Sequence, residues 1–233
     1  DVVLSPDFAT DNTLYFSFSE PGADGNSTAV ASAKLSSDKL TDVKVIFSQQ
    51  PKYKSNHHFG SRLVFDKNGE LFITTGDRGS QRDQAQKLDN HIGKVIRINT
   101  DGTPAKDNPY IKDSKAKPEV WSYGHRNIQG AALHPQTGAL WTHEHGPQGG
   151  DELNIDEAGK NYGWPVITYG ENYGGGPVGA GLTRKAGMEQ PLWQWTPSIA
   201  PSGMVFVRGT RYGKGWQGSL LLGSLKFRYL LRL

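Results

Sequence analysis

Residues 63–77 read LVFDKNGELFITTGD, two apolar runs separated by a short polar segment. An apolar run at its beginning is followed by polar residues that include Asn68 and Gly69, and a second apolar run begins at Leu71. An Asn-Gly pair between two such runs is typical of a β-hairpin, because both residues tolerate the left-handed backbone of tight turns. We therefore expect two antiparallel strands here.

The same pattern recurs along the chain. The other copies are VVLSPDFATDNTLYFSFSE (2–20), AALHPQTGALWTHEHG (131–146) and, more loosely, GMVFVRGTRYGKGWQGSLLLGSL (203–225). Four leucines hold similar places in these copies: Leu14, Leu71, Leu140 and Leu220. A lone hairpin cannot bury its apolar face, whereas blades packed around an axis can. The repeats favour a β-propeller, with a β-sandwich of similar hairpins as the alternative.

The composition agrees with an all-β fold in one domain. The 233 residues include 29 glycines and 13 prolines, which divide a chain into many short elements joined by turns. With 35% hydrophobic and 21% charged residues, the chain has the composition of a globular protein. No segment resembles a domain linker, so we expect a single propeller domain over residues 1–233 with about four blades visible. Helix is expected only as a short turn within residues 80–93.

Charge and cysteine content exclude several classes of function. The net charge is +3, and the basic residues are scattered among the acidic ones, which argues against a nucleic-acid or membrane-surface partner. No apolar run approaches the roughly 18 residues of a membrane-spanning helix. The absence of cysteine excludes disulfides, thiolate metal sites and a cysteine nucleophile. The sequence begins DVVLSPDF, with neither an initiator Met nor a signal-peptide pattern in these residues, and such a start is expected of a processed or trimmed chain.

Two histidines precede the hairpin at residues 63–77, in the segment NHHFGSR. A neutral imidazole such as that of His57 or His58 can accept a proton from a hydroxyl group near neutral pH. Arg62, four residues after His58, could hold an anionic cofactor or a developing oxyanion. A polar loop that merely leads into a strand would contain the same residues.

A second group of polar residues lies in SYGHRNIQG, where Arg126 and Asn127 stand just before an expected strand. A guanidinium beside an amide suits a flat ligand that carries carboxylates or quinone oxygens. An ion pair within a loop is the alternative interpretation.

The segment HEHGPQGGDELN, which begins at His143, combines several potential metal ligands. The spacing of His143 and His145 permits zinc, but no third ligand lies nearby in the sequence. Calcium fits better, because it accepts carboxylates and backbone carbonyls at irregular turns. The turn Gly146-Pro147 and the adjacent carboxylates of Asp151 and Glu152 supply both kinds of ligand.

Two further segments carry candidate ligand contacts. The glycine-containing segment GKNYGWPVITYGENY crowds Tyr162, Trp164, Tyr169 and Tyr173 together. Such aromatic residues often face sugars or flat rings, and they also fill the space between blades. Lys226 follows an apolar strand in LLGSLKFRYL, so its ammonium could face either a ligand or solvent.

Taken in order, these motifs resemble those of a known family. The set NHHFGSRLVF, TTGDRG, WSYGHRNIQG, HEHGPQGGDELN, KNYGWPV and GSLK is similar to that of the soluble, quinone-dependent aldose sugar dehydrogenases, which belong with the glucose/sorbosone dehydrogenases. The resemblance covers nearly the whole chain. It implies a six-bladed β-propeller with pyrroloquinoline quinone (PQQ) on its axis. It also implies an oxidoreductase that converts aldoses to lactones by hydride transfer from C1 to PQQ.

The resemblance assigns roles to individual residues. The family's general base opens an HxxxR strand, which matches His58, with His57 as the fallback, and Arg126 would stabilise the quinone as it is reduced. The expected cofactor contacts are Arg126, Asn127, Tyr173, Ser224, Leu225 and Lys226, and residues 195–198 are expected near the same cleft. Two calcium ions are implied, and their expected ligands are Gly146 and Pro147 for one and Glu152 and the backbone of Tyr162 for the other.

Other expectations follow from departures and from the family. The family carries a glycine- and glutamine-containing segment before VVLSPDF and arginines on a later strand, so we expect the propeller to be incomplete at both ends of these 233 residues. The expected partners are an aldose and an unidentified electron acceptor, the protein is expected as a monomer or homodimer, and its expected location is periplasmic or secreted. The alternative functions are a non-enzymatic, calcium-binding propeller that binds a protein or glycan, and a calcium-dependent lactonase.

Overall fold

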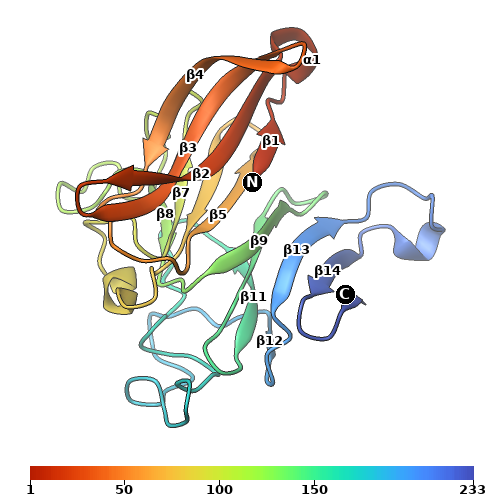
Figure 1. Cartoon of the computed structure of the whole chain (residues 1–233). Helices are drawn as coiled ribbons and strands as arrows, with labels where there is room; N and C mark the ends of the chain where they lie inside the picture. The colour runs from red at the N-terminus through yellow and green to blue at the C-terminus, as the bar shows by residue number, and fades with distance from the viewer.

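The computed structural model describes residues 1–233, which form fifteen β-strands in four antiparallel sheets (Figure 1). The first sheet contains β1 (Val2–Leu4), β2 (Thr13–Gly22), β3 (Gly25–Ser36) and β4 (Lys39–Ser48). The second contains β5 (Gly60–Phe65), β6 (Leu71–Thr75), β7 (Lys94–Ile98) and β8 (Val120–Tyr123). The third contains β9 (Ile128–Leu133), β10 (Leu140–Glu144), β11 (Asp151–Asp156) and β12 (Trp193–Trp195). The fourth contains β13 (Pro201–Phe206), β14 (Leu220–Ser224) and β15 (Tyr229–Arg232).

Helix is scarce, as the sequence predicts. A 3-10 turn, η1 (Arg82–Gln86), lies within the segment expected to hold one, and a second, η2 (Lys214–Trp216), precedes β14. A single α-helical turn, α1 (Phe8–Asp11), lies where the sequence suggested only a polar turn between β1 and β2. It ends at Asn12, which adopts a left-handed conformation with φ 49°.

The four repeat leucines occupy equivalent positions in the four sheets. Each lies at or next to the start of the second strand of its sheet, and each is buried: Leu14, Leu71, Leu140 and Leu220. The repeat in the sequence therefore corresponds to a repeat in three dimensions. The all-β propeller architecture predicted from these repeats is confirmed.

Three apolar clusters hold neighbouring sheets together. In β6, Leu71 and Ile73 face the first sheet, and Phe72 between them faces the third. Alternate side chains of a strand point to opposite faces, so a strand buried on both faces is apolar throughout. The third and fourth sheets meet through Leu153 and Phe206, together with Leu220.

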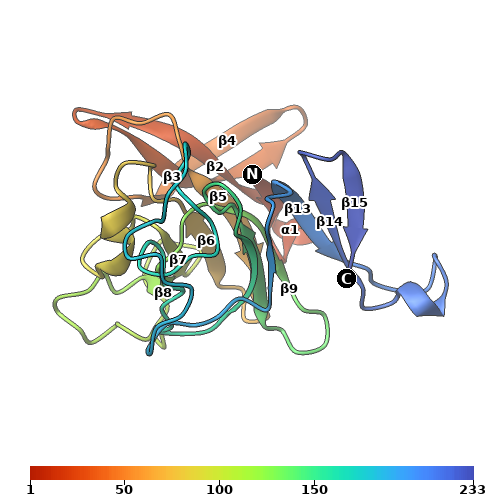
Figure 2. The same cartoon turned by 90° about the horizontal axis from the view of Figure 1, so that it is seen from below.

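The sheets follow one another in chain order along an arc, and their first strands lie toward its inside (Figures 1 and 2). Strand β5 lies against β9, and β9 lies against β13. The loops that precede these inner strands therefore meet at one end of the arc. No helix of the structure is long and apolar enough to cross a membrane.

Candidate functional site

His58 lies in the loop before β5 and is paired with a buried aspartate. Its Nδ1 is 2.5 Å from Oδ1 of Asp77, which lies two residues beyond the end of β6. The other carboxylate oxygen of Asp77 accepts a hydrogen bond of 2.7 Å from Nε1 of Trp164. The Nε2 atom of His58 has no protein partner, and the residue lines a hollow of about 240 Å³. The imidazole is thus held at one nitrogen and free at the other.

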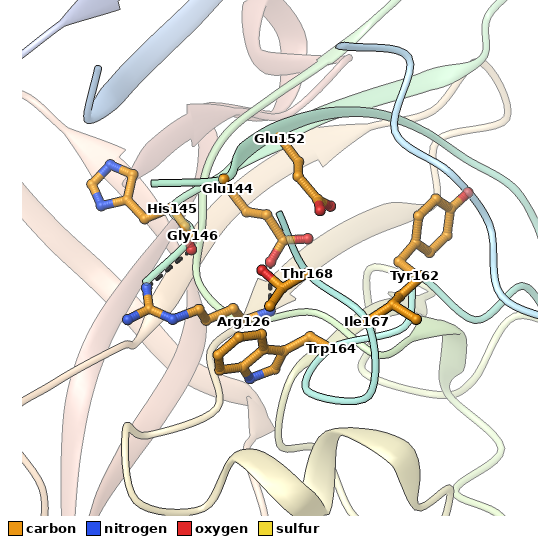
Figure 3. Close-up of a pocket in the computed structure, with 10 residues that line it drawn as sticks. Arg126, Glu144, His145, Gly146, Glu152, Tyr162, Trp164, Ile167 and Thr168 are labelled. Carbon is orange, nitrogen blue, oxygen red and sulfur yellow. Dashed lines mark hydrogen bonds between the residues drawn. The ribbon is translucent and has the colours of Figure 1, made fainter. Parts of the chain in front are cut away.

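The Arg126–Asn127 pair lies before β9, where Glu144 fixes its backbone. One oxygen of Glu144 accepts hydrogen bonds from the backbone N–H groups of Arg126 (2.5 Å) and Asn127 (3.2 Å). The guanidinium of Arg126 donates to the carbonyl of His145 at 3.0 Å and lies 5.3 Å from the ring centroid of Trp164 (Figure 3). Arg126 therefore reaches the same hollow as His58.

Asn127 has a different position from its neighbour. Its side-chain oxygen accepts a hydrogen bond of 3.2 Å from the backbone N–H of Gly60, the first residue of β5. It lines none of the hollows described here, so in this structure it ties the second sheet to the third.

A second hollow, of about 670 Å³, adjoins the first. Pro147 and Tyr173 line both hollows, and Lys226 lines the second. Thr196 and Ser198, from the loop expected near the cleft, also line the second hollow. Segments from the second, third and fourth sheets are thereby brought to one continuous depression.

Ser224 and Leu225, expected with Lys226 as cofactor contacts, line neither hollow. The Ser224 hydroxyl is buried and donates to the carbonyl of Ile199 at 2.7 Å. The backbone N–H of Leu225 donates to the carbonyl of Ala200 at 3.0 Å. Both residues therefore hold the turn from which Lys226 projects.

Arg62 does not reach the site, contrary to its suggested role as an anion-binding group. Its Nε donates to the carbonyl of Gln129 at 2.7 Å, and its Nη1 lies 3.9 Å from the carboxylate of Asp1. Arg62 lines neither hollow. Arg62 links the inner strands below the hollow instead.

A small cavity of about 10 Å³, which is roughly the space of one water molecule, lies beside Arg126 (Figure 3). Gly146, Glu152 and Tyr162, three of the four predicted metal ligands, line it together with Glu144. The fourth, Pro147, lines the two larger hollows.

The carboxylates of Glu144 and Glu152 point into the same space in Figure 3, because the two residues are directly paired across β10 and β11. Burial and the neighbouring charge of Glu144 raise the pKa of Glu152 to about 8. Two carboxylates so arranged favour either a proton or a cation between them.

Main-chain carbonyls complete this acidic cavity. The carbonyl oxygens of Gly146, Pro147 and Tyr162 accept no hydrogen bond from the protein, and the Tyr162 hydroxyl donates to Ile155 at 2.5 Å. No three His, Asp or Glu side chains are close enough to hold a metal ion by themselves. A cation here would therefore use backbone carbonyls as well as carboxylates, a combination typical of calcium.

The histidines that permitted a zinc interpretation point elsewhere. Nε2 of His143 lies 3.3 Å from the carbonyl of Gly203, and Nε2 of His145 lies 2.8 Å from the carbonyl of Pro201. Both rings therefore join the third sheet to β13.

Sequence reasoning missed Asp77, and it named Trp164 only as one of several aromatic residues that could face a ligand, without its contact to Asp77. Both stand in quoted motifs, but 87 positions separate them along the chain. The only signal was a Gly-Asp pair directly after a strand that neighbours the His58 strand.

Comparisons with known proteins agree with this arrangement. The family described as Glucose / Sorbosone dehydrogenase matches residues 1–233. An aldose sugar dehydrogenase of Escherichia coli (strain K12) is 48% identical over 230 residues, which are 97% of this chain and 62% of that protein. An uncharacterized protein of Synechocystis is 45% identical, over 97% of this chain and 57% of its own length. The chain thus spans about three fifths of the length of these relatives.

Solved structures show the same likeness. The apo form of the soluble aldose sugar dehydrogenase of Escherichia coli superposes on this chain with a TM-score of 0.95 at 46% identity. The match covers 100% of this chain and 67% of the chain in that structure. The PQQ-bound form of an aldose sugar dehydrogenase from Streptomyces coelicolor superposes on this chain with a TM-score of 0.75 at 30% identity. The match covers 100% of this chain and 61% of the chain in that structure.

Proposed function

We propose that this chain, which belongs to the glucose/sorbosone dehydrogenase family, carries the catalytic face of an enzyme that oxidises aldose sugars at C1 to lactones. The observation that supports this most directly is the His58–Asp77 pair at a hollow that Arg126 also lines. We place the enzyme in the periplasm or outside the cell, by analogy with the family.

His58 is the general base of this proposal. The Asp77 carboxylate accepts the Nδ1 proton of the imidazole, which leaves the lone pair of Nε2 free. Nε2 then takes the proton from the anomeric hydroxyl of the sugar in the hollow. The bond from Trp164 to Asp77 holds the carboxylate in place while the imidazole gains charge.

The depression has the character that PQQ requires. PQQ carries three carboxylates, and the two hollows are lined by the cationic side chains of Arg82, Arg126 and Lys226. The buried Nε of Arg126 has no protein partner, so the guanidinium keeps a donor for a ligand. When bound, PQQ supplies the electrophilic quinone that accepts the hydride from C1. Arg126 would provide positive charge for the quinone, and Lys226 would neutralise a carboxylate.

Calcium is proposed at the acidic cavity and at the Gly146-Pro147 turn. The raised pKa of Glu152 and the free carbonyls of Gly146, Pro147 and Tyr162 fit a divalent cation. A cation at the turn would neutralise part of the cofactor's charge, and one at Glu152 would relieve its repulsion with Glu144.

Reconstitution tests the proposal. The purified protein is mixed with PQQ and calcium and supplied with aldoses and a dye that accepts electrons. We expect dye reduction that depends on both additions, and a His58→Gln variant slower by about 10² or more. A His57→Gln variant, altered in the same hollow, should keep most of the activity. No reduction with any aldose, together with no PQQ binding in a titration, would favour a non-enzymatic propeller that binds a protein or glycan.

A further inference from the structure

The backbone at His58 is held in an unfavourable conformation. Its φ is 48°, in the left-handed region that side chains other than glycine rarely adopt. Its carbonyl is pressed against Gly76, where an added Cβ would lie 2.1 Å from the carbonyl oxygen. Such a conformation persists only when surrounding contacts fix it.

Arg78 supplies such contacts on both sides of His58. Its Nη1 donates to the carbonyl of His57 at 2.6 Å, and its Nη2 donates to the carbonyl of Ser55 at 2.6 Å. Its Cζ lies 3.7 Å from the ring centroid of Phe59. The Arg78 side chain therefore contacts the residues immediately before and after His58.

Burial and a further hydrogen bond hold the Arg78 side chain itself in place. Arg78 is only 1% exposed, and its Nη2 also donates to Oδ1 of Asn26 in β3 at 2.5 Å. Burial lowers the pKa of Arg78 to about 10, so the guanidinium remains charged at neutral pH. The planar fork of a guanidinium can serve several carbonyls at fixed angles, which an ammonium group cannot do.

Arg78 also follows Asp77 directly in the chain. Asp77, the acid partner of His58, and Arg78, which holds the His58 loop, are therefore neighbours in the chain. Arg78 itself does not line the hollow, so any effect on the reaction must pass through this loop.

We propose that Arg78 is a positioning residue for the reaction: it holds the backbone before His58 and the ring of Phe59 after it, so that Nδ1 stays on Asp77 and Nε2 faces the substrate. This inference rests on the proposed role of His58 as the base. A misplacement of about 1 Å in a reacting group can cost about 10²-fold in rate.

Variants at Arg78 are compared with matched variants at Arg97. Arg97, in β7, is buried as Arg78 is, and it too lies over an aromatic ring, that of Trp121 at 4.9 Å. It pairs with Asp66 and other acids away from the His58 loop. Arg78→Lys and Arg78→Met are made beside Arg97→Lys and Arg97→Met. Each is measured for melting temperature, for kcat and KM with PQQ and calcium, and for backbone hydrogen exchange without cofactor.

We expect Arg78→Met to lower kcat by about 10–100-fold with KM changed less than about 3-fold, and Arg78→Lys to lie between it and the wild type. Without cofactor, exchange at residues 57–60 should quicken in the Arg78 variants while β6 and β7 stay protected. The Arg97 variants should lose thermal stability but keep kcat within about 2-fold. A normal kcat in Arg78→Met, or loop exchange that matches the wild type, would overturn the proposal. An inactive wild type would refute the dehydrogenase function instead, and exchange alone would then decide whether Arg78 holds the loop.

Discussion

Glu144 and Glu152 stand directly opposite each other on β10 and β11 and line the same cavity. Glu144 already has partners. It accepts a hydrogen bond from the backbone N–H of Arg126, and it pairs with the imidazole of His125 at 3.0 Å. Burial opposes the charge on His125, but the carboxylates of Asp156 and Glu144 outweigh it and raise the His125 pKa to about 9. Glu152 is the member of the pair left without a cationic partner.

In calcium-free protein, the stability that Glu152 contributes should fall as the pH rises from about 4.5 to about 8. The folded-state pKa of Glu152 is raised from 4.5 to about 8, so the folded state binds the proton more tightly than the unfolded state does. That contribution is complete below the unfolded pKa and is lost as the pH passes the folded pKa. Melting temperatures across this range, measured in chelator, test the prediction.

The Glu152→Gln variant is the matching test. Its melting temperature should lack the part of the pH dependence that Glu152 contributes. Calcium should raise its melting temperature less than that of the wild type, because an amide cannot replace the carboxylate as a strong ligand. An equal calcium-induced rise in both proteins would show that the cation binds elsewhere.

Asp77→Asn should lower kcat by about 10²-fold and leave KM within a few-fold. An amide cannot both accept the Trp164 hydrogen bond and stabilise the imidazolium of His58 as the carboxylate does. Steady-state kinetics on the reconstituted protein provide the measurement. Asp83→Asn, at an exposed position nearby, is the control and should behave as the wild type. Full activity in Asp77→Asn would remove Asp77 from the mechanism.

Gly146→Ala should abolish calcium-dependent PQQ binding without unfolding the protein. The added Cβ would lie 2.2 Å and 2.3 Å from the carbonyl oxygens of Gly149 and Gly150, so the turn has to move. PQQ titration with and without calcium measures the effect. Gly215→Ala is the control, because its Cβ would meet no atom within 4 Å. Unchanged PQQ binding in Gly146→Ala would show that the turn is not a ligand.

Lys226→Met should weaken PQQ binding by roughly 2- to 5-fold and leave kcat at saturation nearly unchanged. The exposed ammonium lines the second hollow, where it would neutralise a carboxylate, and an exposed ion pair contributes about 0.2–1 kcal/mol. The difference from the wild type should shrink as salt is added, because ions screen such pairs. Lys214→Met, which alters η2, is the control. Equal affinities at low salt would place Lys226 outside the cofactor site.

The sequence by itself determined the sheets, because their signals are local. Alternation of apolar residues and an Asn-Gly turn act within a few residues, so the hairpins and the four equivalent leucines follow from LVFDKNGELFITTGD and its repeats. The motifs also indicated His58, Arg126, Pro147 and Tyr173, which line one hollow. The six-blade count and the assigned roles at the site stay predictions.

Only the tertiary structure decided which side chains meet. Arg62 is four residues from His58 but bonds to Gln129 in another sheet, whereas Trp164 crosses 87 positions to reach Asp77. Arg78, unremarked in the sequence, holds the His58 loop. Side-chain partners depend on how sheets twist and pack against one another, and that packing joins residues whose separation along the chain carries no signal of their contact.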